Sequence, residues 1–174
     1  DVLYDHPTKK FRVSATSAEV TVTHQVEPNG PTRTTTVVPP EKVKVLIVDD
    51  STTVRNLLAS ILKNDPSIEV IGSIDLPSKV EPFIIKNRPD VITLDIHMPE
   101  MDGVQLLKQI QPKFGIPTIM ISSLSQEDGP YVFDALEHGA FDYIKKPSFN
   151  EIANVGPLII ERIKVAGRSS KKSG

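Results

Sequence analysis

The chain has 174 residues, enough for one domain with a substantial core and terminal extensions, but too few for two domains of ordinary size. Its formal net charge of -2 supports neither a nucleic-acid partner nor an anionic membrane surface. There is no cysteine, which excludes disulfides and thiolate metal sites and fits a cytoplasmic location. No apolar run reaches the roughly 20 residues of a membrane-spanning helix, so we expect no membrane insertion.

The first 42 residues differ in composition from the rest. Residues 1–26 contain two strand-like runs, "KFRV" and the alternating "AEVTVTHQV", which are too few to form a core of their own. We interpret this strand-like extension as the end of an upstream domain or as a segment that docks elsewhere. Residues 27–42 contain four prolines and four threonines, a composition typical of a linker.

Residues 43–166 alternate between strand-like apolar runs and segments with helical periodicity. The strand-like runs are "VKVLIVDD", "IEVIG", "DVITLD", "PTIMIS" and "FDYI". The first is almost continuously apolar, as expected for a parallel strand that is buried on both faces. Five strands that alternate with five helices predict an α/β fold with a doubly wound parallel sheet and helices on both faces.

Several residues mark where the predicted helices begin and end. Ser51 or Thr52 is available to cap the first helix, and Pro82 is expected to delay or kink the start of the second, over residues 78–87. Gly139 is expected to end the fourth helix. Gly156-Pro157 is expected to break or restart the last helix, over residues 151–166. Residues 167–174 are predicted to be a flexible tail or the start of a linker to an absent output domain.

Three aspartates follow two of the predicted strands. Asp49 and Asp50 end the first strand and Asp95 ends the third. The functional crevice of a doubly wound sheet lies at the carboxyl ends of its strands, so neighbouring strands would bring these carboxylates together. Two negative charges about 4 Å apart repel by about 4 kcal/mol near a protein surface, so a cation is required. A set of oxygen ligands favours Mg²⁺, and Lys146, just after the fifth strand, supplies a fixed ammonium.

This combination of charges predicts chemistry on phosphorus. A carboxylate flanked by Mg²⁺ and an ammonium can attack a phosphoryl group, because the cations neutralise charge that develops on its oxygens. The product would be an aspartyl phosphate, to which Ser122, at the end of the fourth strand, could donate a hydrogen bond. Taken alone, Asp49 and Asp50 would instead indicate a turn that caps a helix. Because Asp95 and Lys146 also follow predicted strands, the pattern favours a phosphoryl-accepting site over a helix cap.

Four segments carry a family resemblance: "VLIVDDS", "LDIHMPEMDG", "MISSLS" and "GAFDYIKKP". In order and spacing they resemble the signature segments of receiver domains of two-component response regulators. The resemblance implies a flavodoxin-like sheet with strand order 2-1-3-4-5 and Asp95 as the phosphoacceptor. It implies that Asp50, Asp95 and the backbone carbonyl of His97 bind Mg²⁺ directly, and that Asp49 assists through water.

The same resemblance implies the parts of a switch. Ser122 and Tyr143 would be the hydroxyl and aromatic switch pair, Lys146 would contact the phosphoryl group, and the Lys146–Pro147 peptide bond would be cis. A histidine kinase would be the phosphodonor. The segments are most similar to the receiver of chemotaxis protein-glutamate methylesterases, whose catalytic output domain is absent here. We therefore expect this chain to have only self-phosphorylation and autodephosphorylation activity.

Other readings remain open at this point. His97 stands where the methylesterases commonly have glutamate, and we interpret its side chain as a solvated loop residue; Pro99 and Gly103 we interpret as turn residues. A Mg²⁺-dependent phosphohydrolase also forms an aspartyl phosphate, but it usually needs an acid at the position of His97. A pseudo-receiver would require the loss of a key residue, and none is lost. A receiver of a transcription-type regulator is a further alternative.

Overall fold

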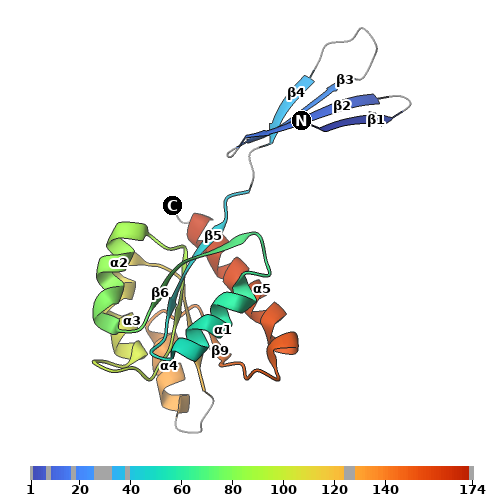
Figure 1. Cartoon of the computed structure of the whole chain (residues 1–174). Coiled ribbons are helices and arrows are strands. Elements are labelled where there is room, and N and C mark those ends of the chain that lie inside the picture. Colours follow the sequence, from blue (N-terminus) through green and yellow to red (C-terminus); the bar gives the residue numbers. More distant parts are fainter. Residues whose placement is uncertain are drawn as a thin grey trace. The chain divides into compact units, whose positions relative to one another are not determined.

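The computed structural model describes residues 2–6, 9–16, 19–25, 33–37, 40–123 and 128–172. The chain divides into two compact units, Asp1–Glu41 and Lys42–Gly174 (Figure 1). The first unit is an antiparallel sheet whose strands pair in chain order. These strands are β1 (Val2–His6), β2 (Lys9–Thr16), β3 (Glu19–Gln25) and β4 (Arg33–Val37).

The first unit contains more strand than the sequence predicted. β2 and β3 overlap the two strand-like runs. The prediction of a linker is wrong for Arg33–Val37, because this segment pairs with β3, from Arg33 opposite His24 to Val37 opposite Val20. The threonines and valine of β4 are β-branched, and such residues favour extended backbone. Residues 26–32, 38 and 39 of the extension and the predicted linker lie outside the described residues.

The second unit is built on a five-stranded parallel sheet in the order β6-β5-β7-β8-β9. Its strands are β5 (Val43–Val48), β6 (Ile68–Ile74), β7 (Val91–Leu94), β8 (Thr118–Ser122) and β9 (Asp142–Lys145). Counted within this unit the order is 2-1-3-4-5, which confirms the predicted doubly wound, flavodoxin-like sheet. β5 and β7 are neighbours, with Val48 opposite Leu94. Their carboxyl ends therefore share one edge, at the point where the strand order reverses.

Helices cover both faces of this sheet (Figure 1). Alternate residues of β5 point to opposite faces: Val45 and Ile47 enter one apolar cluster, and Leu46 and Val48 enter the other. α1 (Thr52–Leu62) and α5 (Ile152–Lys172) pack on the first. The second is covered by α2 (Val80–Asn87), α3 (Gly103–Phe114) and α4 (Gly129–Glu137). Among the described residues, no helix combines the length and apolarity needed to cross a bilayer.

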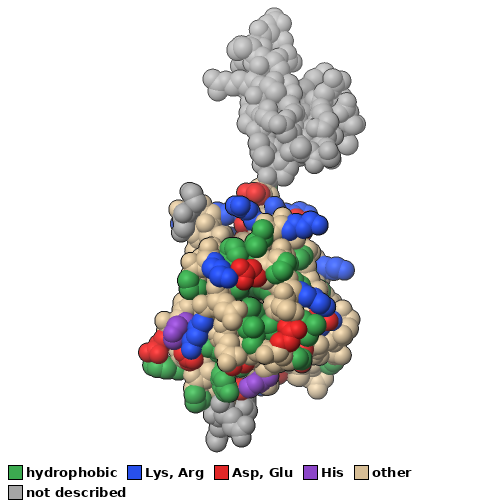
Figure 2. Space-filling view, turned by 90° about the vertical axis from the view of Figure 1, so that its left-hand side faces the viewer, with side chains coloured by type: hydrophobic (Ala, Val, Ile, Leu, Met, Phe, Trp, Pro, Cys, Tyr) green, Lys and Arg blue, Asp and Glu red, His purple; other side chains and the backbone are tan. Residues whose placement is uncertain are grey.

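Ion pairs join the helices on the second face. Lys113 of α3 lies 2.8 Å from Glu81 of α2, and Lys108 of α3 lies 2.8 Å from Asp134 of α4. Figure 2 shows acidic, basic and hydrophobic side chains interspersed there. Exposed pairs of this kind contribute about 0–1 kcal/mol each, so the apolar contacts beneath them hold the helices in place.

Two helix starts follow the sequence signals closely. Ser51, not Thr52, caps α1, because its hydroxyl accepts the N–H of Val54 at 3.3 Å. The second helix begins at Val80, after a 3₁₀ turn over Pro77–Lys79, later than the predicted position 78. Pro82 is the third residue of α2, where an N–H has no partner within the helix, so it removes no hydrogen bond.

The last helix differs from its prediction. α5 is continuous through Gly156-Pro157 and extends to Lys172, so both the expected break and the tail beginning at residue 167 are wrong. Tertiary packing explains the continuation, because Gly156 and Gly167 are buried against Ile61 of α1 and Val43 of β5. Residues 173 and 174 lie outside the described residues.

Replacing Gly167 with alanine is expected to destabilise the unit by about 1–2 kcal/mol, because the new Cβ would lie 2.5 Å from Cγ1 of Val43. The matched control, Gly156→Ala, places its Cβ 3.6 Å from Ile61, an ordinary contact. Because alanine favours helix over glycine by about 1 kcal/mol, this control should be neutral or stabilising. Denaturant unfolding measures both variants. Equal free energies of unfolding would contradict close packing at the end of α5.

Candidate functional site

Three carboxylates meet at the carboxyl ends of β5 and β7. One oxygen from each of Asp49, Asp50 and Asp95 lies within 4.8 Å of the others. Asp49 and Asp95 are only 1% and 2% exposed, whereas Asp50 is exposed. The structure therefore brings together the three aspartates that the sequence predicted to converge, and it leaves Asp50 open to solvent.

Lys146, the residue directly after β9, joins this cluster. Its Nζ lies 2.9 Å from Oδ2 of Asp49 and 3.0 Å from Oδ2 of Asp95. Burial opposes the charge of the ammonium, but hydrogen bonds and charge attraction from the two aspartates outweigh it and raise the pKa of Lys146. The side chain is therefore a fixed cation that bridges two buried carboxylates.

The peptide bond after Lys146 is trans, because no cis peptide bond occurs among the described residues. The predicted cis bond before Pro147 is therefore wrong for this structure. The trans isomer is the more stable one for most X–Pro bonds, by about 0.5–1 kcal/mol. With this isomer, the N–H of Lys146 still donates to the carbonyl of Ser122 at 2.8 Å, which anchors the start of the turn.

Asp95 resists ionisation. Burial, reinforced by the charge of Asp49, raises the pKa of Asp95 to about 6, and Lys146 opposes this shift without cancelling it. A divalent cation would offset the mutual repulsion of the aspartates, and carboxylate oxygens are ligands that suit Mg²⁺. The residues of the cluster thus fit this ion by charge, by donor type and by spacing.

The raised pKa predicts how stability depends on pH. The folded protein binds the Asp95 proton more tightly than the unfolded chain does. The resulting stabilisation, about 2 kcal/mol, is complete below pH 3.8 and is lost as the pH rises through about 6. Mg²⁺ binds the ionised carboxylates, so it should raise the unfolding temperature more at about pH 8 than at about pH 5. Thermal unfolding with Mg²⁺ and with a chelator measures this. An equal effect at both pH values would argue against Asp95 as a ligand.

One hydroxyl on β8 and one on β9 have no hydrogen-bond partner. Ser122 Oγ, at the end of β8, and Tyr143 Oη, in β9, are both buried and unpaired. Burial, together with the charge of Asp128, raises the pKa of Tyr143, so its hydroxyl keeps its proton. Buried polar atoms are usually paired. These two are therefore able to bond to a group that enters the site.

Gly103 lies against the backbone of Asp95, a role that the sequence did not reveal. It is the first residue of α3, and its N–H donates to the carbonyl of Ile96 at 2.7 Å. A Cβ at this position would lie 1.9 Å from the carbonyl oxygen of Asp95. Gly103 is thus required because α3 approaches the backbone of Asp95, not only because a turn is needed.

His97 is exposed, as predicted, but it is not simply solvated. Its Nε2 lies 2.6 Å from Oδ1 of Asp128, whose side chain is 1% exposed against 56% for His97. Its ring also meets that of Tyr131 edge-on at 5.6 Å. No local sequence pattern predicts this contact, because Asp128 is 31 residues away along the chain.

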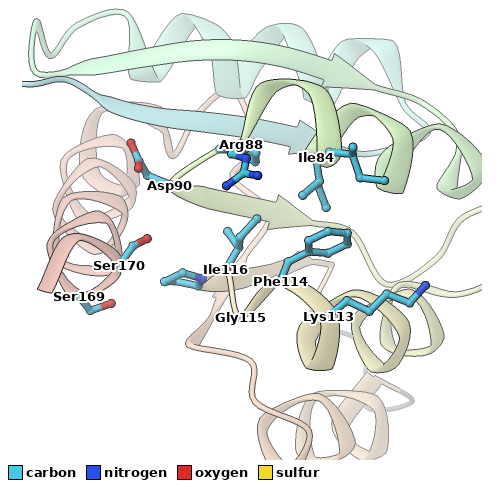
Figure 3. A pocket seen from close by; sticks show the side chains of 12 residues that line it. Ile84, Arg88, Asp90, Lys113, Phe114, Gly115, Ile116, Ser169 and Ser170 are labelled. Carbon is cyan, nitrogen blue, oxygen red and sulfur yellow. The ribbon is translucent and has the colours of Figure 1, made fainter. Parts of the chain in front are cut away.

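A hollow of about 900 Å³ lies at the opposite edge of the sheet (Figure 3). It is lined by residues that precede β7 and β8, including Asp90 and Pro117, and by the ends of α2, α3 and α5. The aspartate cluster lies at the carboxyl ends of the strands, so this hollow takes no part in its chemistry.

Known proteins resemble this chain in the same region. Residues 45–155 match the family model described as response regulator receiver domain. The chain is 38% identical over 134 residues to a protein-glutamate methylesterase/protein-glutamine glutaminase of Syntrophotalea carbinolica, covering 75% of this chain and 38% of that protein. It is 47% identical over 107 residues to one from Rhodopseudomonas palustris, covering 62% of this chain and 30% of that protein.

A solved structure is also similar to this chain over the same region. The response regulator domain of Thermotoga maritima CheB is 36% identical, with a TM-score of 0.67, and the match covers 74% of this chain and 98% of that one. The curated relatives are much longer than the matched region, and this chain spans only 38% and 30% of the two proteins above.

Proposed function

The chain belongs to the response regulator receiver family, and we propose that it is a phosphorylation-operated switch in which Asp95 accepts a phosphoryl group from a histidine kinase. The buried arrangement of Asp49, Asp95 and Lys146 is the observation that carries this proposal. One ammonium lies 2.9 and 3.0 Å from two carboxylates that are almost fully buried. Such a site attracts a divalent cation and an anionic phosphoryl group together.

In the proposed reaction, an oxygen of Asp95 forms a bond to phosphorus as the bond between phosphorus and the kinase histidine breaks. The histidine nitrogen keeps the electron pair of the broken bond. Asp50, Asp95 and the carbonyl of His97 would hold Mg²⁺ directly, with Asp49 acting through water, and the ion would supply charge neutralisation for the transferred group. Lys146, already 3.0 Å from Asp95, would pair with a phosphoryl oxygen.

The switch would use the two unpaired hydroxyls. Ser122 would donate to the new phosphoryl group, and Tyr143 would change its position in response. Both belong to strands next to α4 and α5, and that region exposes large apolar side chains, namely Tyr131, Phe133, Leu136, Phe141 and Leu158. A change from 1:99 to 99:1 between two states needs about 5.5 kcal/mol, which a few charge-assisted hydrogen bonds can provide.

The output of the switch would be a chemotaxis protein-glutamate methylesterase domain. The support is the similarity to methylesterase receivers in both sequence and structure. The relatives extend well beyond the matched region, which leaves length for such a domain. We infer that the protein works in the cytoplasm, where a histidine kinase delivers its phosphoryl group, without inserting into the membrane or binding nucleic acid.

The competing functions receive less support. A phosphohydrolase would need an acid at position 97, where this chain has a histidine whose Nε2 is engaged by Asp128. A pseudo-receiver would lack one of the reacting groups, yet the aspartates and Lys146 are together.

The test is incubation with acetyl phosphate and Mg²⁺, followed by mass measurement of the intact protein. We expect a mass gain of one phosphoryl group. No gain should occur when a chelator is present from the start of the incubation. An unchanged mass, under conditions that modify a known receiver, would refute the proposal. Continuous release of phosphate over many turnovers would instead favour the hydrolase.

A further inference from the structure

The loop that follows Asp95 is joined to the start of α4 by a side-chain contact. His97 comes two residues after Asp95 in the sequence, and its Nε2 lies 2.6 Å from Oδ1 of Asp128. The carboxylate can only accept, so Nε2 carries the donated hydrogen. Asp128 immediately precedes α4 and makes no capping hydrogen bond to it through its side chain. Its carboxylate is instead directed to a residue of another loop.

The contact is anchored on the α4 side. Asp128 is 1% exposed, so solvent does little to weaken the short contact that its carboxylate makes with His97. Tyr131, in the first turn of α4, adds an edge-on ring contact to His97, with an interplanar angle of 76°. Two residues at the start of α4 therefore contact one imidazole.

We propose that His97, Asp128 and Tyr131 form a clasp that couples the Asp95 loop to α4. This proposal rests on the proposed function, and it adds a second connection to the one through Ser122 and Tyr143. The backbone carbonyl of His97 is an expected Mg²⁺ ligand, so ion and phosphoryl binding would act on the residue whose side chain holds Asp128. A movement of this loop would then be transmitted to the start of α4 through one short hydrogen bond.

The same helix offers a matched control. His138 also contacts an aspartate, with its Nδ1 2.9 Å from Oδ1 of Asp134. Asp134 lies in the C-terminal half of α4 and His138 directly follows the last residue of that helix, Glu137; the side chains of His138 and Asp134 are 45% and 40% exposed. This contact joins residues one helical turn apart and does not itself connect α4 to another segment, and the ion pair of Asp134 with Lys108 of α3 does not involve His138. Substitution of His138 therefore removes a similar contact without touching the clasp.

The first experiment measures amide chemical shifts before and after addition of Mg²⁺ and beryllium trifluoride, a mimic of the phosphoryl group. In the unmodified protein, the amides of Gly103, beside Asp95, and Ala135, in α4, should both shift. In His97→Ala the Gly103 shift should persist, while the Ala135 shift should fall by about half or more. His97→Gln keeps an N–H donor and should restore the response, and His138→Ala should behave as the unmodified protein does.

The second experiment tests the clasp without any ligand. Hydrogen exchange of the first amides of α4 that have a partner within the helix should be about tenfold faster in His97→Ala and unchanged in His138→Ala. His97 is 56% exposed, so its truncation leaves the core intact. An undiminished Ala135 shift in His97→Ala, or unaltered exchange at the start of α4, would overturn the clasp. The absence of a Gly103 shift in the unmodified protein would overturn the proposed function instead, and the exchange measurement would still decide the clasp.

Discussion

Asp95→Asn is expected to abolish phosphoryl acceptance, lowering the rate by about a thousandfold or more. The amide oxygen of asparagine is a poor nucleophile, and the neutral side chain is a weaker ligand for Mg²⁺. Asparagine has nearly the same shape, so the fold is retained. Intact mass after incubation with acetyl phosphate and Mg²⁺ measures the effect.

Stability separates this loss from misfolding. Asp95 is buried beside the charge of Asp49, and its pKa is raised to about 6, so its ionised form is held at a cost near neutral pH. A neutral side chain avoids this cost, and the Asn variant should be more stable than the unmodified protein by about 2 kcal/mol at pH 7 in a chelator. A function lost together with stability would point to a damaged fold.

Asp75 offers a control at the same edge of the sheet. It follows β6 as Asp95 follows β7, but it pairs with Lys79 at 2.7 Å and lies outside the aspartate cluster. Asp75→Asn should accept a phosphoryl group at the unmodified rate. If Asp95→Asn still gained mass, the acceptor would have to be another group, and Asp49 or Asp50 would be the next to test.

The sequence predicted the reacting groups because each follows directly from a strong local signal. Asp49, Asp50 and Asp95 come at the ends of apolar runs, and Lys146 follows another. Once these runs are strands of a doubly wound sheet, their carboxyl ends must meet, whatever the details of the loops. The position of the cluster is therefore a consequence of the strand order, which the structure confirms.

Other features depend on contacts that no local pattern encodes. The continuity of α5 opposes the usual effect of Gly156-Pro157, because packing of its last turns on β5 outweighs local propensity. The pairing of His97 with Asp128 joins residues from separate loops. The prolines and threonines of residues 27–42 predict a linker, whereas β4 is a strand because it pairs with β3.

Gly103→Ala is expected to have the second largest effect, since it tests how closely α3 approaches Asp95, the proposed phosphoacceptor. The added Cβ would lie 1.9 Å from the carbonyl oxygen of Asp95 and 2.9 Å from its carbonyl carbon. Both are backbone atoms that no side-chain rotation can move away. We expect a loss of about 3 kcal/mol in the free energy of unfolding.

The same substitution should also slow phosphorylation, because relief of the clash must shift either α3 or the backbone that holds the Asp95 carboxylate. A misplacement of about 1 Å can cost about a hundredfold in rate. Gly129→Ala is the matched control, since Gly129 is likewise the first residue of a helix and a Cβ there meets nothing within 4 Å. Denaturant unfolding and the rate of mass gain should separate the two variants. Equal stability and equal phosphorylation rates for Gly103→Ala and Gly129→Ala would show that the start of α3 does not position Asp95.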